Sequence, residues 1–436
     1  MEPRKILIIT YYWPPAGGPG VQRWLKFAKY LPDFGWEPVI YTPENPSYPL
    51  LDESLLKDVP ENIATVRTKI WEPYQLAEKL NKSNKKYKAG QFDVGENQNW
   101  KSRLSIWIRG NFFIPDARVF WVRPSVRFLE QYLKEHKINM VVTSGPPHSL
   151  HLIGLNLKKK LPDLKWIADF RDPWTEISYY KHLKLTKRSD RKHRHFESEV
   201  FRNADITLAT SYTDAENFRK NGANAVCITN GFDESDSGNR NPQNNKTSRF
   251  TLSYIGVLEQ LRNPVTLWKT LDELVRTNPD FAKNFVLKFA GRIDDRISDA
   301  IKNSGLKNHV LNLGYLSHDK AIDEMYSSDM LLITNFPDAS SKGIIPGKIF
   351  EYLATGKQII SFGPEDADVS SILSETGAGK HFSYDDSGAV KNFILEKYSL
   401  WKNGNLSENA RDISQFSRVK LTEKLSDILI RLSTDH

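Results

Sequence analysis

KILIIT at Lys5–Thr10 is the stretch that decides the fold, together with the loop YYWPPAGGPG at 11–20 and the segment Val21–Leu31. The first run is short, apolar and rich in β-branched residues, which predicts a buried parallel strand. In the third segment apolar residues recur at the spacing of one helix face. Gly35 ends this unit, and Glu37–Tyr41 predicts the next strand. A strand, a loop, a helix and a strand in this order indicate a doubly wound sheet.

The same alternation continues along the chain. Further strands of the first half are predicted at Met140–Thr143, Trp166–Asp169, Ile206–Ala209 and Val226–Thr229. In the second half, a helix is predicted at Pro264–Val275 and strands are predicted at Phe250–Ile255, Val286–Ala290, Val310–Leu313, Met330–Ile333 and Gln358–Ser361. The sequence therefore predicts two α/β segments, each with its own sheet.

A polar run at 234–248 separates the two segments and lacks strongly apolar side chains. Such a run cannot contribute to a core, so we interpret it as a linker. We expect an N-terminal Rossmann-like domain over 1–233, with an irregular insertion at about 45–125, and a second such domain over 249–415. Because ligands of open α/β sheets bind beyond the carboxyl ends of the strands, we expect the site in a central cleft between the domains.

Composition narrows the class of protein. The chain has 436 residues, which is too long for one ordinary core, and 26% of them are charged and 39% hydrophobic, as in soluble globular proteins. One cysteine, Cys227, argues against a disulfide framework and a cysteine-based metal cluster. We expect a reducing, cytoplasmic location, because the chain shows neither a signal peptide nor an apolar run that could span a bilayer. The net charge of +8 favours anionic partners.

The strongest local signal is PGKIFEYLATGK, which begins at Pro346. Pro346 suits the first turn of a helix and Gly356 suits its C-terminal cap. Lys348 and Glu351 are three residues apart and therefore share one face. Lys348 and the N–H groups around Gly347 would meet a diphosphate, and Glu351 would accept hydrogen bonds from ribose hydroxyls. The same spacing also fits an exposed helix pair that stabilises by about 0.2–0.5 kcal/mol.

A second candidate lies in the loop GVLEQLRNP, which follows the first strand of the second half. Gly256 lets the backbone approach a ligand, and Arg262 precedes the next helix. An arginine at this place can bind a diphosphate through two N–H groups. The alternative is a solvated arginine in an ordinary turn.

In the first half, Gly17 and Gly18 follow the first strand and would admit a sugar or phosphate close to the backbone. The loop lacks the G-x-G-x-x-G fingerprint, which disfavours a dinucleotide cofactor.

Two polar stretches also stand at strand ends of the first half, and they carry His148 and the cluster Asp169, Arg171 and Asp172. His148 would exchange or orient an acceptor proton, and the cluster would bind hydroxyls or stabilise charge. The structural alternatives are a histidine that caps a helix and an ion-pair network that satisfies itself.

Two segments suggest a surface partner. Residues 181–195 form the most basic run, and 100–113 mixes cations with Trp and Phe. Both compositions suit an anionic membrane surface, where each Lys or Arg contributes about 1 kcal/mol. A solvated charged face is the ordinary alternative, and RNA binding fits the composition equally well, although no RNA-recognition signature is present.

Taken together, these motifs resemble glycosyltransferase family four, the retaining glycosyltransferases of GT-B fold. The resemblance covers nearly the whole chain and is carried by the order and spacing of its pieces. These are YWPPAGG at 12–18, ITNGFD at 228–233, GVL at 256–258, FAG at 289–291, LGY at 313–315, SDM at 328–330 and KIFEYLATG at 348–356.

The resemblance implies an α/β protein of two Rossmann-like doubly wound domains that face a central cleft. It implies a UDP- or GDP-linked sugar bound mainly by the C-terminal domain, an acceptor bound mainly by the N-terminal domain, and neither a metal nor a cofactor. Cationic side chains, here Arg262 and Lys348, would then stabilise the departing diphosphate. Glu351 matches the second glutamate of the family's Glu-x7-Glu pattern. A helix over about Ser417–Leu432, within 416–436, would return toward the N-terminal domain.

The chain departs from the family at two positions. The first glutamate of that pattern would fall at Gly343, so Ser340, Ser341 or Lys342 would have to read the donor sugar, whose identity stays open. An arginine usually follows the glycine at 256, where this chain has Val257, and Arg262 would supply the charge instead.

We therefore expect a glycosyltransferase that moves a hexose or N-acetylhexosamine to a glycan or lipid-linked acceptor in cell-surface polysaccharide biosynthesis. It would act in the cytoplasm or at the inner face of the plasma membrane. Two alternatives stay open. One is a nucleotide-sugar epimerase or hydrolase, which would need a second carboxylate near the donor. The other is a basic protein that binds membranes or nucleic acid without catalysis.

Overall fold

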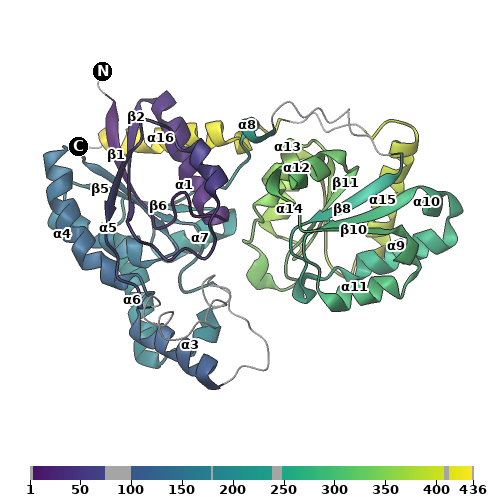
Figure 1. Cartoon of the computed structure of the whole chain (residues 1–436), viewed down its shortest axis with the longest axis horizontal. Coiled ribbons are helices and arrows are strands. Elements are labelled where there is room, and N and C mark those ends of the chain that lie inside the picture. The colour runs from purple at the N-terminus through teal and green to yellow at the C-terminus, as the bar shows by residue number, and fades with distance from the viewer. Residues whose placement is uncertain (1–2, 74–99, 178–179, 238–247, 407–411, 435–436) are drawn as a thin grey trace. The chain divides into compact units, whose positions relative to one another are not determined.

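The computed structural model describes residues 3–73, 100–177, 180–237, 248–406 and 412–434. The chain divides into two compact units (Figure 1). Unit 1 consists of Met1–Thr229 and Arg418–His436, and unit 2 consists of Asn230–Ser417. Each unit is built on one parallel sheet, so the expected α/β fold of two Rossmann-like units is confirmed.

The sheet of unit 1 has seven parallel strands in the order β3-β2-β1-β4-β5-β6-β7. Their bounds are β1 Arg4–Ile9, β2 Trp36–Pro43, β3 Ala64–Thr68, β4 Met140–Gly145, β5 Lys165–Phe170, β6 Ile206–Ala209 and β7 Ala225–Cys227. The helices of this unit are α1 Pro19–Tyr30, α3 Trp100–Phe112, α4 Val119–Glu135, α5 Ser149–Lys160, α6 Lys187–Asn203, α7 Tyr212–Lys220 and α16 Arg418–Thr434. The strands expected from the sequence are all present.

Both faces of this sheet are buried, because successive side chains of a strand point to opposite faces. In β1, Leu7 and Ile9 join a core that α4, α5, α6 and α7 complete. Ile6 and Ile8 join the core on the other face, under α1 and α16. The Nε1 of Trp36 donates to Oγ of Ser426 at 3.1 Å, so the C-terminal helix belongs to unit 1.

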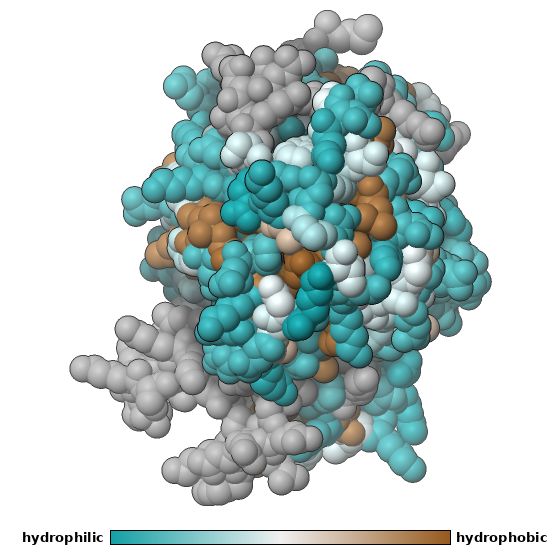
Figure 2. All heavy atoms as spheres, turned by 90° about the vertical axis from the view of Figure 1, so that its right-hand side faces the viewer, coloured by the Kyte–Doolittle hydropathy of each residue, from teal (hydrophilic) through white to brown (hydrophobic). Residues whose placement is uncertain are grey.

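Unit 2 repeats the topology with six parallel strands in the order β10-β9-β8-β11-β12-β13. The strands are β8 Phe250–Ile255, β9 Phe285–Ala290, β10 Val310–Gly314, β11 Met330–Thr334, β12 Gln358–Phe362 and β13 Gly379–Phe382. The helices are α8 Glu234–Ser237, α9 Val265–Thr277, α10 Pro279–Asn284, α11 Asp295–Lys302, α12 His318–Ser327, α13 Lys348–Ala354, α14 Asp368–Thr376 and α15 Ser387–Lys402. Hydrophilic side chains cover most of the coloured surface that Figure 2 shows, with small apolar patches between them.

The structure differs from the sequence-based expectation at three places. The expected insertion at 45–125 contains β3, which pairs with β2 and belongs to the main sheet. Its residues 74–99 lie outside the described residues. The expected linker begins with helix α8, and the rest of it, 238–247, also lies outside the described part of the chain. Strand β13 was not expected, because GKHF has only one strongly apolar residue.

Candidate functional site

The strand orders locate the sites. In each sheet the order of connection reverses beside the first strand, between β1 and β4 in unit 1 and between β8 and β11 in unit 2. At such switch points adjacent loops leave in opposite directions, and ligands bind beyond the carboxyl ends of the strands. The residues predicted to bind the donor follow β8 and β11. Those predicted for the acceptor follow β1, β4 and β5.

Lys348 lies at the switch point of unit 2. Its Nζ donates a hydrogen bond to the carbonyl of Ile255, the last residue of β8, at 2.7 Å. The same amine lies 4.1 Å from the ring centroid of Tyr254. The first residue of α13 is thus anchored on the end of β8, although the two are 93 positions apart in the sequence.

Burial and, to a lesser degree, the positive charge of Arg262 lower the pKa of Lys348 to about 7, although Glu351 opposes the shift. Near neutral pH this amine therefore exchanges between its charged and neutral forms. An anion placed beside it would favour the charged form. A half-buried lysine with this pKa is suited to gain charge when a diphosphate arrives.

Two glycines bring backbone close to this amine. Gly256 has φ of +121°, and a Cβ built on it would lie 3.1 Å from Nζ of Lys348. Gly291 has φ of +125°, and a Cβ there would lie 2.2 Å from the carbonyl oxygen of Gly256. Both positions need glycine for conformation, and the second also needs it for space. The hydroxyl of Tyr352 accepts a hydrogen bond from the Ile255 amide at 3.3 Å, which fixes the end of β8.

Arg262 stands at the edge of the same site. Its Nη2 donates to Oε2 of Glu259 at 3.1 Å and to the carbonyl of Val257 at 3.3 Å. Its guanidinium lies 5.5 Å from the ring centroid of Phe336. The side chain is 22% exposed and its charge acts on Lys348. The ion pair with Glu259 is the arrangement expected of a solvated turn, so a ligand would have to compete with it.

Helix α13 has seven residues, and Gly356 follows its end with φ of +69°, as predicted for a C-terminal cap. Gly347 is exposed and directly precedes the helix, and Glu351 is half-buried in its first turn. Glu351 influences the pKa of both Lys348 and Tyr352, so these groups lie within electrostatic range of one another.

The three residues proposed to replace the missing glutamate at Gly343 have contacts of their own. Ser341 is fully buried and donates to the carbonyl of Phe336 at 2.6 Å. Ser340 bonds the carboxylate of Asp338. Lys342 pairs with Asp366 at 2.5 Å. Of these three residues, Ser340 and Lys342 can reach a ligand at the surface, whereas Ser341 could do so only if the core opened.

In unit 1, His148 is buried just before α5, and its ring stacks on Trp174 at 5.1 Å with an interplanar angle of 5°. Burial holds its pKa well below the usual value, and the charges of His151 and Arg171 act in the same direction. The ring is therefore neutral at physiological pH. The predicted catalytic role stays a prediction, with a neutral imidazole as its starting state.

The cluster after β5 separates into three environments. Asp169 is fully buried, where it pairs with Arg23 at 3.0 Å and accepts from Trp24 at 2.7 Å and Ser144 at 3.0 Å. Burial with these partners leaves Asp169 without exposed surface in this structure, which favours the ion-pair network that satisfies itself over a role in lining a cleft.

The other two members of the cluster lie nearer the surface. Arg171 donates to the carbonyl of Gly20 at 2.7 Å and to that of Pro146, which ties the first turn of α1 to the loop after β4. Asp172 is exposed. Asp172 is thus the one carboxylate of this cluster that a ligand can reach.

The predicted glycine pair also divides. Gly17 donates its amide to the carbonyl of Leu50 at 2.9 Å, and a Cβ there would lie 3.0 Å from the Leu50 side chain. Gly18 has φ of +92° and open space around it. Gly17 therefore packs against the 50–52 segment, whereas Gly18 provides the turn into α1.

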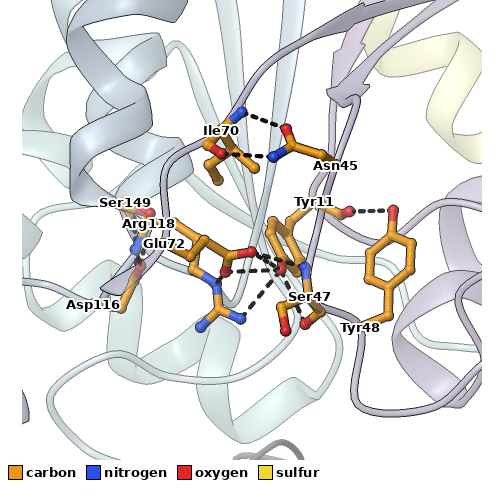
Figure 3. Close-up of polar contacts among 9 residues, drawn as sticks. All are labelled: Tyr11, Asn45, Ser47, Tyr48, Ile70, Glu72, Asp116, Arg118 and Ser149. Carbon is orange, nitrogen blue, oxygen red and sulfur yellow. Dashed lines mark hydrogen bonds and ion pairs between the residues drawn. The ribbon is translucent and has the colours of Figure 1, made fainter. Parts of the chain in front are cut away.

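A buried network in unit 1 was missed by the sequence analysis (Figure 3). Glu72 is fully buried, and its Oε1 lies 3.0 Å from Nε of Arg118. The Tyr11 hydroxyl lies 2.9 and 3.1 Å from the two Glu72 oxygens and accepts from Arg118 at 3.3 Å. Burial raises the pKa of this tyrosine. The members of this network come from the loop after β1, from the segment after β3 and from the loop before α4, so no local sequence motif indicates them.

Asp116 joins this network to α5. Its carboxylate accepts from the amide and the hydroxyl of Ser149, each at 2.9 Å, and from the amide of Arg118 at 2.9 Å. The bond to the Ser149 amide satisfies one donor in the first turn of α5, which begins directly after His148. Asp116 therefore links the start of α5, directly after His148, to the loop before α4.

Solved structures share this architecture. A glycosyltransferase from Rickettsia africae matches over 100% of both chains, with TM-score 0.62 and 14% identity. Anabaena HepE, solved in complex with UDP-glucose, matches over 98% of this chain and 99% of its own, with TM-score 0.58 and 14% identity. Sucrose-phosphate synthase from Thermosynechococcus elongatus matches over 99% and 100%, with TM-score 0.61 and 13% identity. No protein-family model matches the sequence, and no curated protein matches it significantly.

At these identities the likeness establishes the fold. The chain has the two-unit Rossmann-like architecture that is found in GT-B glycosyltransferases. Function has to be argued from the site, because one fold can carry several chemistries.

Proposed function

We propose that this protein is a retaining glycosyltransferase that moves a hexose or N-acetylhexosamine from a UDP- or GDP-linked sugar to a glycan or lipid-linked acceptor. One observation carries the proposal. The amine of Lys348, with its pKa near 7, lies beside Gly256 at the carboxyl end of β8, where the strand order reverses. A half-buried cation beside accessible backbone suits an anion such as a diphosphate.

Each predicted donor residue has a role in this proposal. Lys348 and Arg262 stabilise the charge that develops on the diphosphate as the bond between the sugar C1 and the phosphate oxygen breaks. Glu351 accepts hydrogen bonds from the ribose. The acceptor oxygen bonds to C1 on the face that the diphosphate leaves, and the hydroxyl proton departs with the diphosphate. Because side-chain cations take the charge, the reaction needs neither a metal nor a cofactor.

Unit 1 provides the acceptor side in this proposal. His148 and Asp172 contact the reacting groups, Gly18 admits the acceptor near the backbone, and Arg171 holds the loops in place. The structural observation in favour is that these residues follow β1, β4 and β5 at the carboxyl edge of the sheet.

Nucleotide binding is the direct test. Isothermal titration with UDP, GDP and ADP should show micromolar binding of one nucleotide, and Glu351→Ala should abolish it. Glu396→Ala on α15 is the matched control, because Glu396 is 60% exposed and pairs with its neighbour Lys397. Lack of binding by all three nucleotides would contradict the proposal and favour the non-catalytic basic protein.

The stereochemistry has its own test. Proton NMR of the first product formed from an α-linked donor should show an α-linkage, and chelation of divalent metals should leave the rate unchanged. An inverted product would refute the retaining mechanism. Isomerisation of the donor sugar without any acceptor would identify the epimerase instead.

The proposed setting is cell-surface polysaccharide biosynthesis, on the cytoplasmic side of the plasma membrane. None of the helices in the described part of the chain is both long and apolar enough to cross a bilayer. A lipid-linked acceptor would therefore be reached from the membrane surface, which is where a peripheral enzyme works. Fractionation of cells that express the tagged protein should find it in the cytosol and on the inner membrane, and an exclusively secreted protein would contradict this.

A further inference from the structure

Helix α3 carries an apolar face that is open to solvent. The exposed fractions are 46% for Leu104, 37% for Trp107, 38% for Ile108 and 68% for Phe112. These positions are separated by three, one and four residues and therefore lie on one side of the helix. Single exposed apolar residues are ordinary, but a row of four on one face marks an interaction surface.

Further aromatic residues are linked to the end of this helix through ring contacts. Phe113 follows it directly and contacts Phe120 at 5.9 Å between ring centroids. Phe120 in turn meets Trp71 edge-on at 4.7 Å, and these two are 44% and 49% exposed. We call these residues, with the four on α3, the aromatic face. It includes two tryptophans, the residue type that prefers the boundary between lipid and water.

The C-terminal end of α3 is fixed to the start of α6. A Cβ on the buried Gly110 would lie 2.7 Å from the Leu185 side chain, so the two backbones approach closely. The side-chain amide of Asn111 donates to the carbonyl of Lys184 at 3.3 Å and accepts from the amide of Thr186 at 2.8 Å. The C-terminal end of α3 and the N-terminal end of α6 are therefore one structural piece, which Figure 1 shows at one end of unit 1.

That contact places cations next to the aromatic face. Lys184, Lys187 and Arg188 are all exposed and lie within four residues of the atoms that Asn111 binds. Arg191 extends the exposed cationic side of α6 by one turn. Apolar side chains able to enter a lipid interface and cations able to meet head groups are thus combined at one end of unit 1.

We propose that this end of unit 1 docks on an anionic lipid bilayer, with the aromatic face in the interface and Lys184, Lys187 and Arg188 against phosphate head groups. Charge complementarity and the aliphatic members of the face argue for lipid as the occupant. Leu104 and Ile108 have no flat ring on which a base can stack, so the face fits hydrocarbon better than nucleic acid. The surface deepens the proposed function, because a lipid-linked acceptor is presented at a bilayer.

Vesicle sedimentation tests the docking without donor or turnover. Full-length protein is mixed with vesicles of phosphatidylcholine alone or with a third of phosphatidylglycerol. We expect strong partition onto the anionic vesicles only, weakened by salt. Lys187→Gln with Arg188→Gln should lower the partition coefficient about 25-fold, at about fivefold per cation. Trp107→Ala with Phe112→Ala should lower it at least about tenfold.

Matched controls lie away from the face. Ile430→Ala on α16 removes an apolar side chain that is 41% exposed, and Lys302→Gln with Lys320→Gln removes two exposed cations from unit 2. Both should partition like the wild type. Circular dichroism melts of every variant establish that it is folded. The proposal would be overturned if either test variant partitioned like the wild type or if the wild type bound neutral and anionic vesicles equally. It would also be overturned if the protein bound a DNA or RNA oligonucleotide and did not bind vesicles. Loss of vesicle binding with nucleotide binding intact would refute the docking surface but not the proposed enzyme. Vesicle binding without nucleotide binding would refute the proposed enzyme but not the docking surface.

Discussion

Donor binding should weaken steeply as the pH rises through neutrality. The free protein holds Lys348 at a pKa of about 7. About three quarters of these amines carry a proton at pH 6.5, and about 3% do at pH 8.5. A bound diphosphate raises the pKa of the amine and keeps it charged. The dissociation constant of the intact nucleotide sugar should therefore rise about 25-fold between these pH values.

Isothermal titration measures both parts of this prediction. The diphosphate of a nucleotide sugar stays fully ionised over the whole range, so the pH dependence reports on the protein. Titration in two buffers of different ionisation enthalpy should show the uptake of nearly one proton at pH 8. Lys348→Met should weaken binding about 10- to 100-fold at pH 6.5 and lose the pH dependence. Lys320→Met on α12, an exposed lysine, is the control and should behave like the wild type.

A dissociation constant that stays constant from pH 6.5 to pH 8.5 in the wild type would refute this reasoning. It would mean that Lys348 does not face the diphosphate, or that it is charged throughout the range. The hydrogen bond to the Ile255 carbonyl would then be a structural anchor and not part of the donor site.

Three further results are expected. Without ligand, the unfolded chain binds more protons at Lys348 than the folded chain does between about pH 7 and pH 10. The free energy of unfolding of the wild type, measured with urea, should therefore rise relative to that of Lys348→Met by about 1.4 kcal/mol per pH unit. A difference that stays constant with pH would contradict the shifted pKa. Gly256→Ala requires an alanine at φ of +121° and places its Cβ 3.1 Å from the Lys348 amine. This substitution should lower the free energy of unfolding by about 1–3 kcal/mol and weaken donor binding. Gly388→Ala, whose Cβ would lie in open space, should be neutral or stabilising in the same unfolding assay. Asp169→Asn should lower the free energy of unfolding by about 3–5 kcal/mol, because it leaves the buried Arg23 poorly paired. Glu216→Gln, in an exposed pair with Lys220, should lower it by less than about 1 kcal/mol. An Asp169→Asn protein as stable as the wild type would show that Arg23 needs no counter-charge.

Local chemistry was enough to predict most of the fold. Apolar runs such as those at Lys5–Thr10 and Phe250–Ile255 are buried on both sides. A short apolar run without helical spacing is typical of a central parallel strand. Strand β3 escaped because it lies at the sheet edge, where most of its residues stay partly exposed. An edge strand forms by hydrogen bonding to its neighbour and does not require an alternating apolar pattern. The strand conformation of β3 therefore depends on its pairing with β2.

The donor site shows the same division. The sequence by itself determined that Lys348 and Glu351 share the first turn of a helix after a glycine, since helical spacing is a local property. Only the tertiary structure decided that Lys348 reaches the end of β8, because the lysine and Ile255 are brought together by packing across 93 positions. It likewise buried Asp169 and assembled Tyr11, Glu72 and Arg118, whose partners are distant in the sequence. Charge pairing in a core depends on which segments the fold brings together, and no spacing rule along the chain contains that information.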